Sequence, residues 1–202
     1  MTDRLERHWF RKGNGAKPAD FADGFFIAEL EFQCEFGLRA FGEMQNACST
    51  DPRHPALIAL AHALLVYAGN VAKILTAPAK ASPRMRSRTK RIQGMLGLEG
   101  ADFEQIRLAR NYFEHFDERM DRFVGSHSGL LIHRRVQESY PTEVELDDGR
   151  KFEPAFLQFL ETSTLQLILY DQTFSLPAII KTLENIQSKA KEWLAARGPA
   201  AA

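Results

Sequence analysis

The residues 107–123, RLARNYFEHFDERMDRF, place Arg110, Asn111 and His115 within six positions of one another. A histidine titrates near neutral pH and can take a proton from a ribose 2′-hydroxyl or give one to a leaving 5′-oxygen. A guanidinium group can grip a phosphate through two hydrogen bonds and stabilise the charge of its transition state. An asparagine can orient either group. Together these three side chains would suit phosphodiester cleavage that needs no metal ion.

The helix that carries them is predicted to run from Phe103 to about Val124. Its apolar residues recur at intervals of three and four and should face the core; they are Phe103, Ile106, Ala109, Phe113, Phe116, Met120 and Phe123. Four polar residues point the opposite way, namely Arg107, Asn111, Glu114 and Glu118, and Arg110 and His115 flank this polar strip.

Spacing alone leaves two interpretations of the polar strip. Arg110 with Glu114 and Glu118 with Arg122 are ion pairs four residues apart, each worth a few tenths of a kcal/mol on a solvated helix. In this interpretation His115 is a surface histidine. Alternatively, a second copy of the chain related by a two-fold axis would bring two histidines and two arginines together in one site.

Arg110-Asn111-Tyr112-Phe113-Glu114-His115 resembles the RNxxxH form of the Rx4–6H motif of the HEPN superfamily. The wider segment RNYFEHFDER is similar to the version in bacterial HEPN-like proteins, some of them linked to abortive infection. The resemblance implies an α-helical up-and-down bundle, a homodimer and a metal-independent endoribonuclease that leaves a 2′,3′-cyclic phosphate and a 5′-hydroxyl. By position, Arg110 and His115 match the catalytic pair of the family, and Asn111 matches its intervening polar residue.

The resemblance also implies a place in bacterial defence or in a toxin–antitoxin system, with an antitoxin protein as partner and RNA as substrate. Toxins whose partner is a nucleotidyltransferase often carry a tyrosine two places after the histidine, where this chain has Asp117, so modification of such a tyrosine is not expected. Many members of the superfamily have lost activity. The alternative function is therefore a catalytically inactive helical module for binding or dimerisation.

A basic stretch precedes this helix. The interval between Asp51 and Glu99 contains no acidic residue, and the candidates for RNA binding within it are Arg84, Arg86, Arg88, Lys90 and Arg91. Each contact to a phosphate would steepen the salt dependence of binding. A flexible, solvated connector is the other interpretation, because the aromatic residues typical of single-strand binding are missing there.

The composition is typical of a soluble globular protein. The chain has 202 residues, 45% of them hydrophobic, and its 26 basic and 26 acidic residues cancel, which argues against a uniformly basic nucleic-acid-coating protein. Cys34 and Cys48 would lie about 21 Å apart along one helix, too far for a disulfide. Reduced thiols and the lack of a secretory leader in the first residues indicate a cytoplasmic protein.

Neither a membrane segment nor a cofactor is expected. The most apolar segment, residues 55–76, carries His62, Asn70 and Lys73 and is interpreted as a core helix. There is no cysteine–histidine cluster for zinc, and no glutamate stands three residues before His62 or His115, as a di-iron bundle would require. We therefore predict no metal.

The expected fold is mainly α: an up-and-down four-helix bundle with a small β-rich insert before the last helix, in a single domain over residues 1–202. The four helices are placed at 21–49, 55–76, 103–124 and 176–196, with a loop over 77–89 and a short basic helix after it. Residues 1–20 are expected to be an irregular arm, and 197–202 a disordered tail.

The insert spans residues 125–175. LLIHRRV and a hairpin turning at Asp148-Gly149 are predicted to be strands, PAFLQFLETS a short helix, and the segment 163–176 a strand pair.

Overall fold

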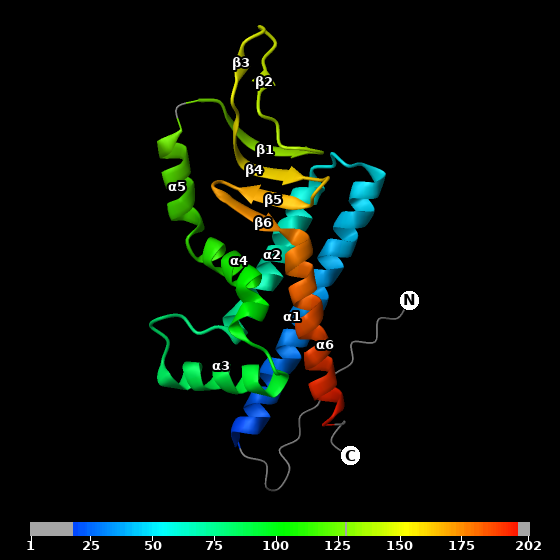
Figure 1. Ribbon diagram of the computed structural model, residues 1–202, viewed down its shortest axis with the longest axis vertical. Coiled ribbons are helices and arrows are strands. Elements are labelled where there is room, and N and C mark those ends of the chain that lie inside the picture. Colours follow the sequence, from blue (N-terminus) through cyan, green and yellow to red (C-terminus); the bar gives the residue numbers. More distant parts are fainter. Residues whose placement is uncertain (1–17, 128, 198–202) are drawn as a thin grey trace.

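The computed structural model describes residues 18–127 and 129–197. Two long antiparallel helices, α1 (Pro18–Thr50) and α2 (Ala56–Leu75), form its spine, and α6 (Leu176–Ala195) packs along α1 (Figure 1). The helix α4 (Glu104–Glu114) packs against α2, after the short 3-10 turn Gly100–Phe103. The helix α3 (Pro83–Leu96) crosses the lower end of this group, and α5 (Phe116–Ser126) rises beside the sheet.

The helix α2 occupies the centre because it is apolar on most sides. Eleven of its 20 residues are buried, among them Leu57, Leu64 and Leu75. Within the described residues it is also the one helix long and apolar enough to cross a bilayer, but more than half of that window is buried inside the protein. Its apolar surface is thus used for packing against α1 and α4.

A mixed four-stranded sheet caps one end of the helices. Its order is β1-β4-β5-β6, with β1 (Leu131–Gln137) parallel to β4 (Ala155–Glu161). The remaining pairs are antiparallel and involve β5 (Gln166–Leu169) and β6 (Gln172–Ser175). A separate hairpin of β2 (Val144–Glu145) and β3 (Lys151–Phe152) extends from the connection between β1 and β4, and α2 contacts β4 from below.

The prediction of an up-and-down four-helix bundle is wrong. The described residues form six α-helices and a four-stranded sheet that is an integral layer of the protein. The segment 154–163, predicted to be helical, contains β4, whose run AFLQFLE is buried on both faces. A strand covered on both faces reads as a continuous apolar run, which periodicity cannot tell from a short helix.

The expected loop over 77–89 is also partly wrong, because α3 begins at Pro83. Proline at a first helical position lacks only an N–H that would have no partner there. Ser82 caps the helix by accepting a hydrogen bond from the Met85 N–H at 3.2 Å. The basic stretch is therefore mostly helical.

Several local predictions are confirmed. The structure contains α1, α2 and α6 within a few residues of the expected bounds, as well as β1 and the β5–β6 pair. The hairpin turns at Gly149, whose φ of 79° lies in the left-handed region that favours glycine. The helix α1 starts at Pro18, inside the expected arm 1–20. The rest of that arm and the tail 198–202 lie outside the described residues.

Candidate functional site

The predicted third helix is broken at His115, where φ is −131° and ψ is 29°. The sequence has neither glycine nor proline at this point, and the cause lies in tertiary packing. Tyr112 of α4 and Phe116 and Phe123 of α5 surround the ring of Tyr170, with centroid distances of 5.9, 6.0 and 5.7 Å. In a straight helix Tyr112 and Phe123 would be about 16 Å apart along the axis. The bend lets both helices pack against one ring.

Arg110 lies in the interior, not at the edge of a polar strip, so its predicted position is wrong. Arg110 as a whole residue is 9% exposed. Its Nε donates to Glu114 Oε1 at 2.9 Å, and its Nη1 donates to the Thr76 hydroxyl at 2.9 Å and to the Thr76 carbonyl at 3.3 Å. Thr76 caps the C-terminal end of α2, where carbonyl groups lack helical partners. Arg110 therefore ties α4 to the end of α2.

The close approach of these two helices explains why Arg110 is buried. A Cβ atom placed on Gly69 of α2 would lie 3.5 Å from the Arg110 Cα, so the α4 backbone passes directly over this glycine. The residue at the crossing point must direct its side chain along the helix interface. The end of α2 then supplies its acceptors.

His115 lies on the surface, as the solvated interpretation predicted. Its side chain is 57% exposed, and its Nδ1 is 3.5 Å from Glu118 Oε2. Asn111, one turn earlier, is half-buried. Among the described contacts, Arg110 bonds to Glu114 and Thr76, whereas His115 meets Glu118. Within one chain the structure therefore does not bring the arginine and the histidine into one hydrogen-bonded cluster.

The predicted apolar stripe is only partly buried. Phe103, Ile106, Ala109 and Phe123 face the core, and Tyr112 joins them. The Phe113 side chain lies outside the described residues. Beyond the bend, Phe116 and Met120 of the stripe are exposed, whereas Phe123 stays buried.

Three apolar residues of α5 form an exposed strip. Phe116 is 37% exposed, Met120 38% and Val124 45%, at successive intervals of four residues. We call these three residues the α5 strip. It begins next to His115.

The five predicted RNA-binding residues divide into two groups. Arg91 makes a two-pronged contact with Asp23 of α1 at 2.7 and 3.0 Å, and Arg88 lies over the ring of Phe26 at 4.3 Å from its centroid. These two side chains hold α3 against α1. Arg84, Arg86 and Lys90 are exposed, although Arg86 also donates to the Ala79 carbonyl at 3.3 Å. The outward group remains able to meet a ligand.

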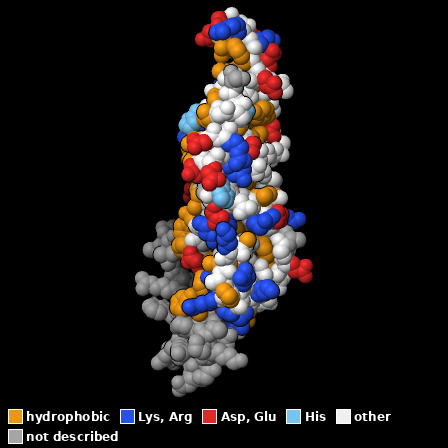
Figure 2. All heavy atoms as spheres, turned by 90° about the vertical axis from the view of Figure 1, so that its left-hand side faces the viewer, with side chains coloured by type: hydrophobic (Ala, Val, Ile, Leu, Met, Phe, Trp, Pro, Cys, Tyr) orange, Lys and Arg blue, Asp and Glu red, His pale blue; other side chains and the backbone are white. Residues whose placement is uncertain are grey.

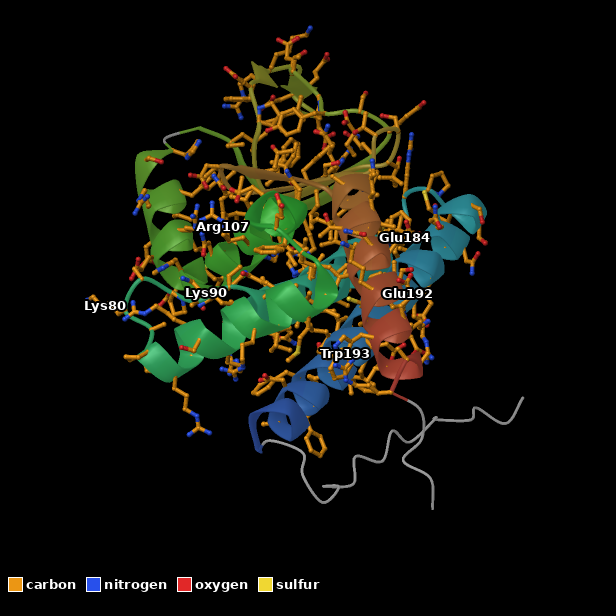
Figure 3. The ribbon with its side chains drawn as sticks, turned by 60° about the horizontal axis from the view of Figure 1, so that its bottom comes forward. Lys80, Lys90, Arg107, Glu184, Glu192 and Trp193 are labelled. Atoms are coloured by element: carbon orange, nitrogen blue, oxygen red, sulfur yellow. The ribbon has the colours of Figure 1, made fainter. Side chains whose placement is uncertain are left out.

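Two more cations join this outward group. Figure 3 shows Lys80, Lys90 and Arg107 on the same side of the molecule, with Glu184 and Glu192 on α6 away from them. Lys80 begins the basic stretch that the sequence offered for RNA contact, whereas Arg107 was not expected there, because its place on the same side is a tertiary feature. Arg107 is paired with Glu104, whose carboxylate pKa is lowered by this hydrogen bond.

The charge around His115 itself is mixed. Asp117, Glu118 and Asp121 are all exposed on α5, and Arg119 is 3.6 Å from Asp171 of the β5–β6 turn. Figure 2, which views the side that bears α5, shows acidic and basic side chains interleaved at mid-height and basic ones gathered lower down, over α3. A polyanion would therefore meet its strongest attraction at α3.

A recess of about 630 Å³ separates α5 from the sheet. Arg119, Arg122 and His127 line one side, and Tyr140 and Tyr170 line another. Burial, above all, raises the pKa of both phenols, so they remain protonated at neutral pH. Glu153 and Asp171 also line the recess, and the two signs of charge give it no preference for one ligand charge. Sequence analysis assigned His127 no role, and no local signal marks this recess.

Other reactive groups are set apart from these surfaces. Cys34 and Cys48 are both free, and burial raises the pKa of the Cys34 thiol, which keeps it unreactive. Across residues 18–127 and 129–197, the side chains that commonly bind metals do not gather in groups of three or more.

No family model matches this chain, and comparisons with curated proteins and with solved structures find no similar protein. The resemblance to the HEPN superfamily therefore rests on the segment around Arg110 and His115.

Proposed function

We propose that the chain is a HEPN-like protein of the cytoplasm that acts as a homodimer and cleaves RNA without a metal ion. The observation that carries this proposal is the place of His115: an open imidazole at a helix break, 3.5 Å from the Glu118 carboxylate. A carboxylate at one ring nitrogen orients the imidazole and leaves the other nitrogen free for proton transfer. Asn111 precedes it by one turn and would orient the substrate.

In this proposal Arg110 is chiefly a positioning residue. Its bonds to Glu114 and Thr76 hold the last turn of α4 on α2. They thereby fix the position of His115, which directly follows α4. Because Glu114 already accepts from the Arg110 Nε, a substrate phosphate would compete with this carboxylate for the guanidinium. RNA phosphates further from the scissile bond would meet Arg84, Arg86 and Lys90, with Lys80 and Arg107 on the same side of the molecule.

The α5 strip supports pairing of two copies. Phe116, Met120 and Val124 form a continuous apolar edge that begins at the residue after His115. If a two-fold axis passed through this strip, each copy would cover the other's apolar edge and the two His115 residues would approach one another. In a toxin–antitoxin setting, an antitoxin protein that covered the same strip would block the site.

The proposed cleavage is tested with purified protein, EDTA and a set of RNA oligonucleotides. We expect products with 2′,3′-cyclic phosphate and 5′-hydroxyl ends, and a loss of at least about 100-fold in rate for His115→Ala, the scale of general acid–base catalysis. His133→Ala removes another exposed histidine, on β1, and should leave the rate unchanged. Cleavage that persists in His115→Ala would refute the role of His115.

A second function, a catalytically inactive RNA-binding module, is favoured by a different observation. The Arg110 guanidinium is already buried and bonded to Glu114 and Thr76, as in a structural arginine. In that case neither the natural chain nor His115→Ala cleaves RNA, and both bind it equally. Reversal of charge at Arg84 and Lys90 should then weaken binding and flatten its dependence on salt. Fluorescence anisotropy at two salt concentrations measures both effects.

A further inference from the structure

A second cavity, of about 310 Å³, lies between the turn that joins α1 to α2 and the carboxyl end of β1. Figure 1 shows the arrowhead of β1 beside that turn, on the opposite side of the molecule from α5. Arg53 comes from the turn, and Arg134 and Arg135 come from the strand. The cavity is thus separate from the face that carries His115.

Three arginines line this cavity and no carboxylate does. Three acidic residues flank the lining without being part of it: Asp51 lies two residues before Arg53, Glu138 follows Gln137, and Glu161 is the β4 partner of Gln137. Asp51 Oδ1 accepts the backbone N–H of Arg53 at 2.9 Å, and the carboxylate of Glu161 accepts from the Tyr140 N–H and the Thr164 hydroxyl. The charged residues that line the cavity itself are therefore all positive.

Two of the guanidinium groups are held in place by neutral partners. Arg134 Nε donates to the side-chain oxygen of Gln158 at 2.8 Å, and Gln158 is only 7% exposed. Gln137, oriented with its amide oxygen toward Arg135, accepts from Arg135 Nη2 at 2.9 Å. A neutral partner fixes a guanidinium without cancelling its charge. The remaining donors of both arginines are left for a ligand.

The field of these arginines acts on a neighbouring group. The pKa of His62, on α2, is lowered by burial first and then by the charge of Arg134. The helix α2 also begins at this cavity, and its first turn contains no acidic residue, so the helix dipole adds to the positive potential.

We propose that this cavity binds a mononucleotide by its phosphate group. Arginine matches phosphate through paired hydrogen bonds, and the cavity offers arginines from two segments, the turn and the edge strand β1. Because successive side chains of a strand point to opposite faces, Arg134 and Arg135 would reach a phosphate from the two sides of β1. Pro55, Ile58 and Val136 supply an apolar wall for the sugar or base. The volume is at the lower end of the range for small-molecule sites, which suits one nucleotide and not a strand. This proposal does not depend on the function proposed for His115.

The first test measures binding of AMP, adenosine and inorganic phosphate to the full chain by calorimetry at low salt. We expect AMP to bind with a dissociation constant below about 1 mM, phosphate to bind more weakly and adenosine not to bind. If adenosine binds as tightly as AMP, or if AMP does not bind at millimolar concentration, the proposal is wrong.

Variants then assign the binding to this cavity. Arg53→Ala and Arg135→Ala should each weaken AMP binding about tenfold or more, and Arg135→Lys by less, because lysine keeps the charge but not the paired geometry. Arg150→Ala is the matched control, since Arg150 is an exposed arginine paired with Asp148 on the β2–β3 hairpin. Circular dichroism confirms that each variant is folded. Unchanged AMP affinity in both cavity variants would overturn the proposal.

A last comparison identifies the source of the phosphate. An RNA oligonucleotide with a 5′-phosphate is compared with the same strand bearing a 5′-hydroxyl. AMP should displace neither RNA strand from the basic surface of α3. If the 5′-phosphorylated strand binds this cavity more tightly than AMP, and Arg135→Ala removes that preference, the ligand is an RNA end and the assignment to a free mononucleotide is wrong.

Discussion

At the scale of single residues, Arg110 is a charged side chain held inside the protein by acceptors on two residues. It is 9% exposed, and its bonds to Glu114 and Thr76 join α4 to the end of α2. The pair is asymmetric, because Glu114 is 39% exposed and remains partly hydrated. Removing the arginine takes a donor from the Thr76 carbonyl and leaves a cavity between the helices, although the Thr76 hydroxyl keeps its bond to the Ala72 carbonyl. Removing Glu114 leaves a buried cation with fewer partners.

We therefore predict that Arg110→Ala lowers the free energy of unfolding by about 2 kcal/mol, less than a fully buried pair would lose. Chemical denaturation followed by circular dichroism measures this change. Arg107→Ala on the same helix breaks an exposed pair with Glu104 and should change stability by less than about 1 kcal/mol. Equal effects of the two substitutions would contradict a structural role for Arg110.

His62 makes stability depend on pH. Its pKa in the folded state is lowered from the ordinary value of 6.5, first by burial and then by Arg134. The unfolded chain therefore takes up a proton at a pH where the folded chain does not. Stability is complete above the unfolded pKa and falls as the pH drops from about 6.5 toward the lowered pKa of the folded state.

We predict that His62→Gln flattens this part of the stability profile. The free energy of unfolding is measured for the natural chain and the variant at several pH values between 5 and 8. The measured quantity is the difference between the two slopes of unfolding free energy against pH. Absolute stability is not used, because other histidines titrate in both proteins. Parallel profiles would show that His62 has the same pKa in both states. Arg134→Gln should shift the profile in the same direction by a smaller amount.

At the scale of elements, the bend between α4 and α5 depends on Tyr170. This residue has a φ of 54°, a left-handed conformation that non-glycine residues seldom adopt, yet it is only 5% exposed. Its ring contacts Tyr112, Phe116 and Phe123, which come from both sides of the bend. Burial of the ring offsets the unfavourable backbone, and the turn between β5 and β6 thereby sets the direction of α5.

We predict that Tyr170→Ala lowers the free energy of unfolding by about 3 kcal/mol, as other buried aromatic truncations do. Tyr170→Phe keeps the ring and should cost about 1 kcal/mol or less, from the lost hydroxyl. Hydrogen exchange should become faster in α5 for the alanine variant and stay unchanged in the phenylalanine variant. An unaltered exchange rate in α5 of Tyr170→Ala would mean that other contacts hold the bend.

At the scale of the whole molecule, the α5 strip is the surface on which the proposed homodimer depends. Phe116, Met120 and Val124 are more than a third exposed, and the bend carries them away from the helical core. Isolated apolar residues on a surface are common, but three at successive turns of one helix form a continuous edge. Burial of such an edge against its own copy removes apolar surface from water on both chains.

We predict that the natural chain sediments as a dimer and that Met120→Glu shifts it to a monomer, because a carboxylate would be buried without a partner at the two-fold axis. Val66→Glu is the control, since Val66 of α2 is 44% exposed and lies outside the α5 strip. Analytical ultracentrifugation distinguishes the two states. A monomeric natural chain would exclude this interface, and a dimer that survives in Met120→Glu would place the contact elsewhere.

Local patterns predicted many elements of this fold correctly. The apolar periodicity of residues 55–76, the proline at the start of α6 and the Asp148-Gly149 turn each reflect interactions within a few residues of the chain. The segment of β4 was predicted wrongly because its pairing with β1 and β5 supplies what its own sequence leaves open. One strand assigned as a helix was enough to hide a four-stranded sheet.

The sequence by itself determined which residues could do chemistry and where most helices run, because residue type and periodicity are local properties. Only the tertiary structure decided that Arg110 turns inward at Gly69, that the helix breaks at His115, and that Arg53 joins Arg134 and Arg135 around one cavity. These outcomes depend on contacts between segments far apart in the chain. Burial and electrostatic environment are properties of such contacts, and so the arrangement of charge followed from packing.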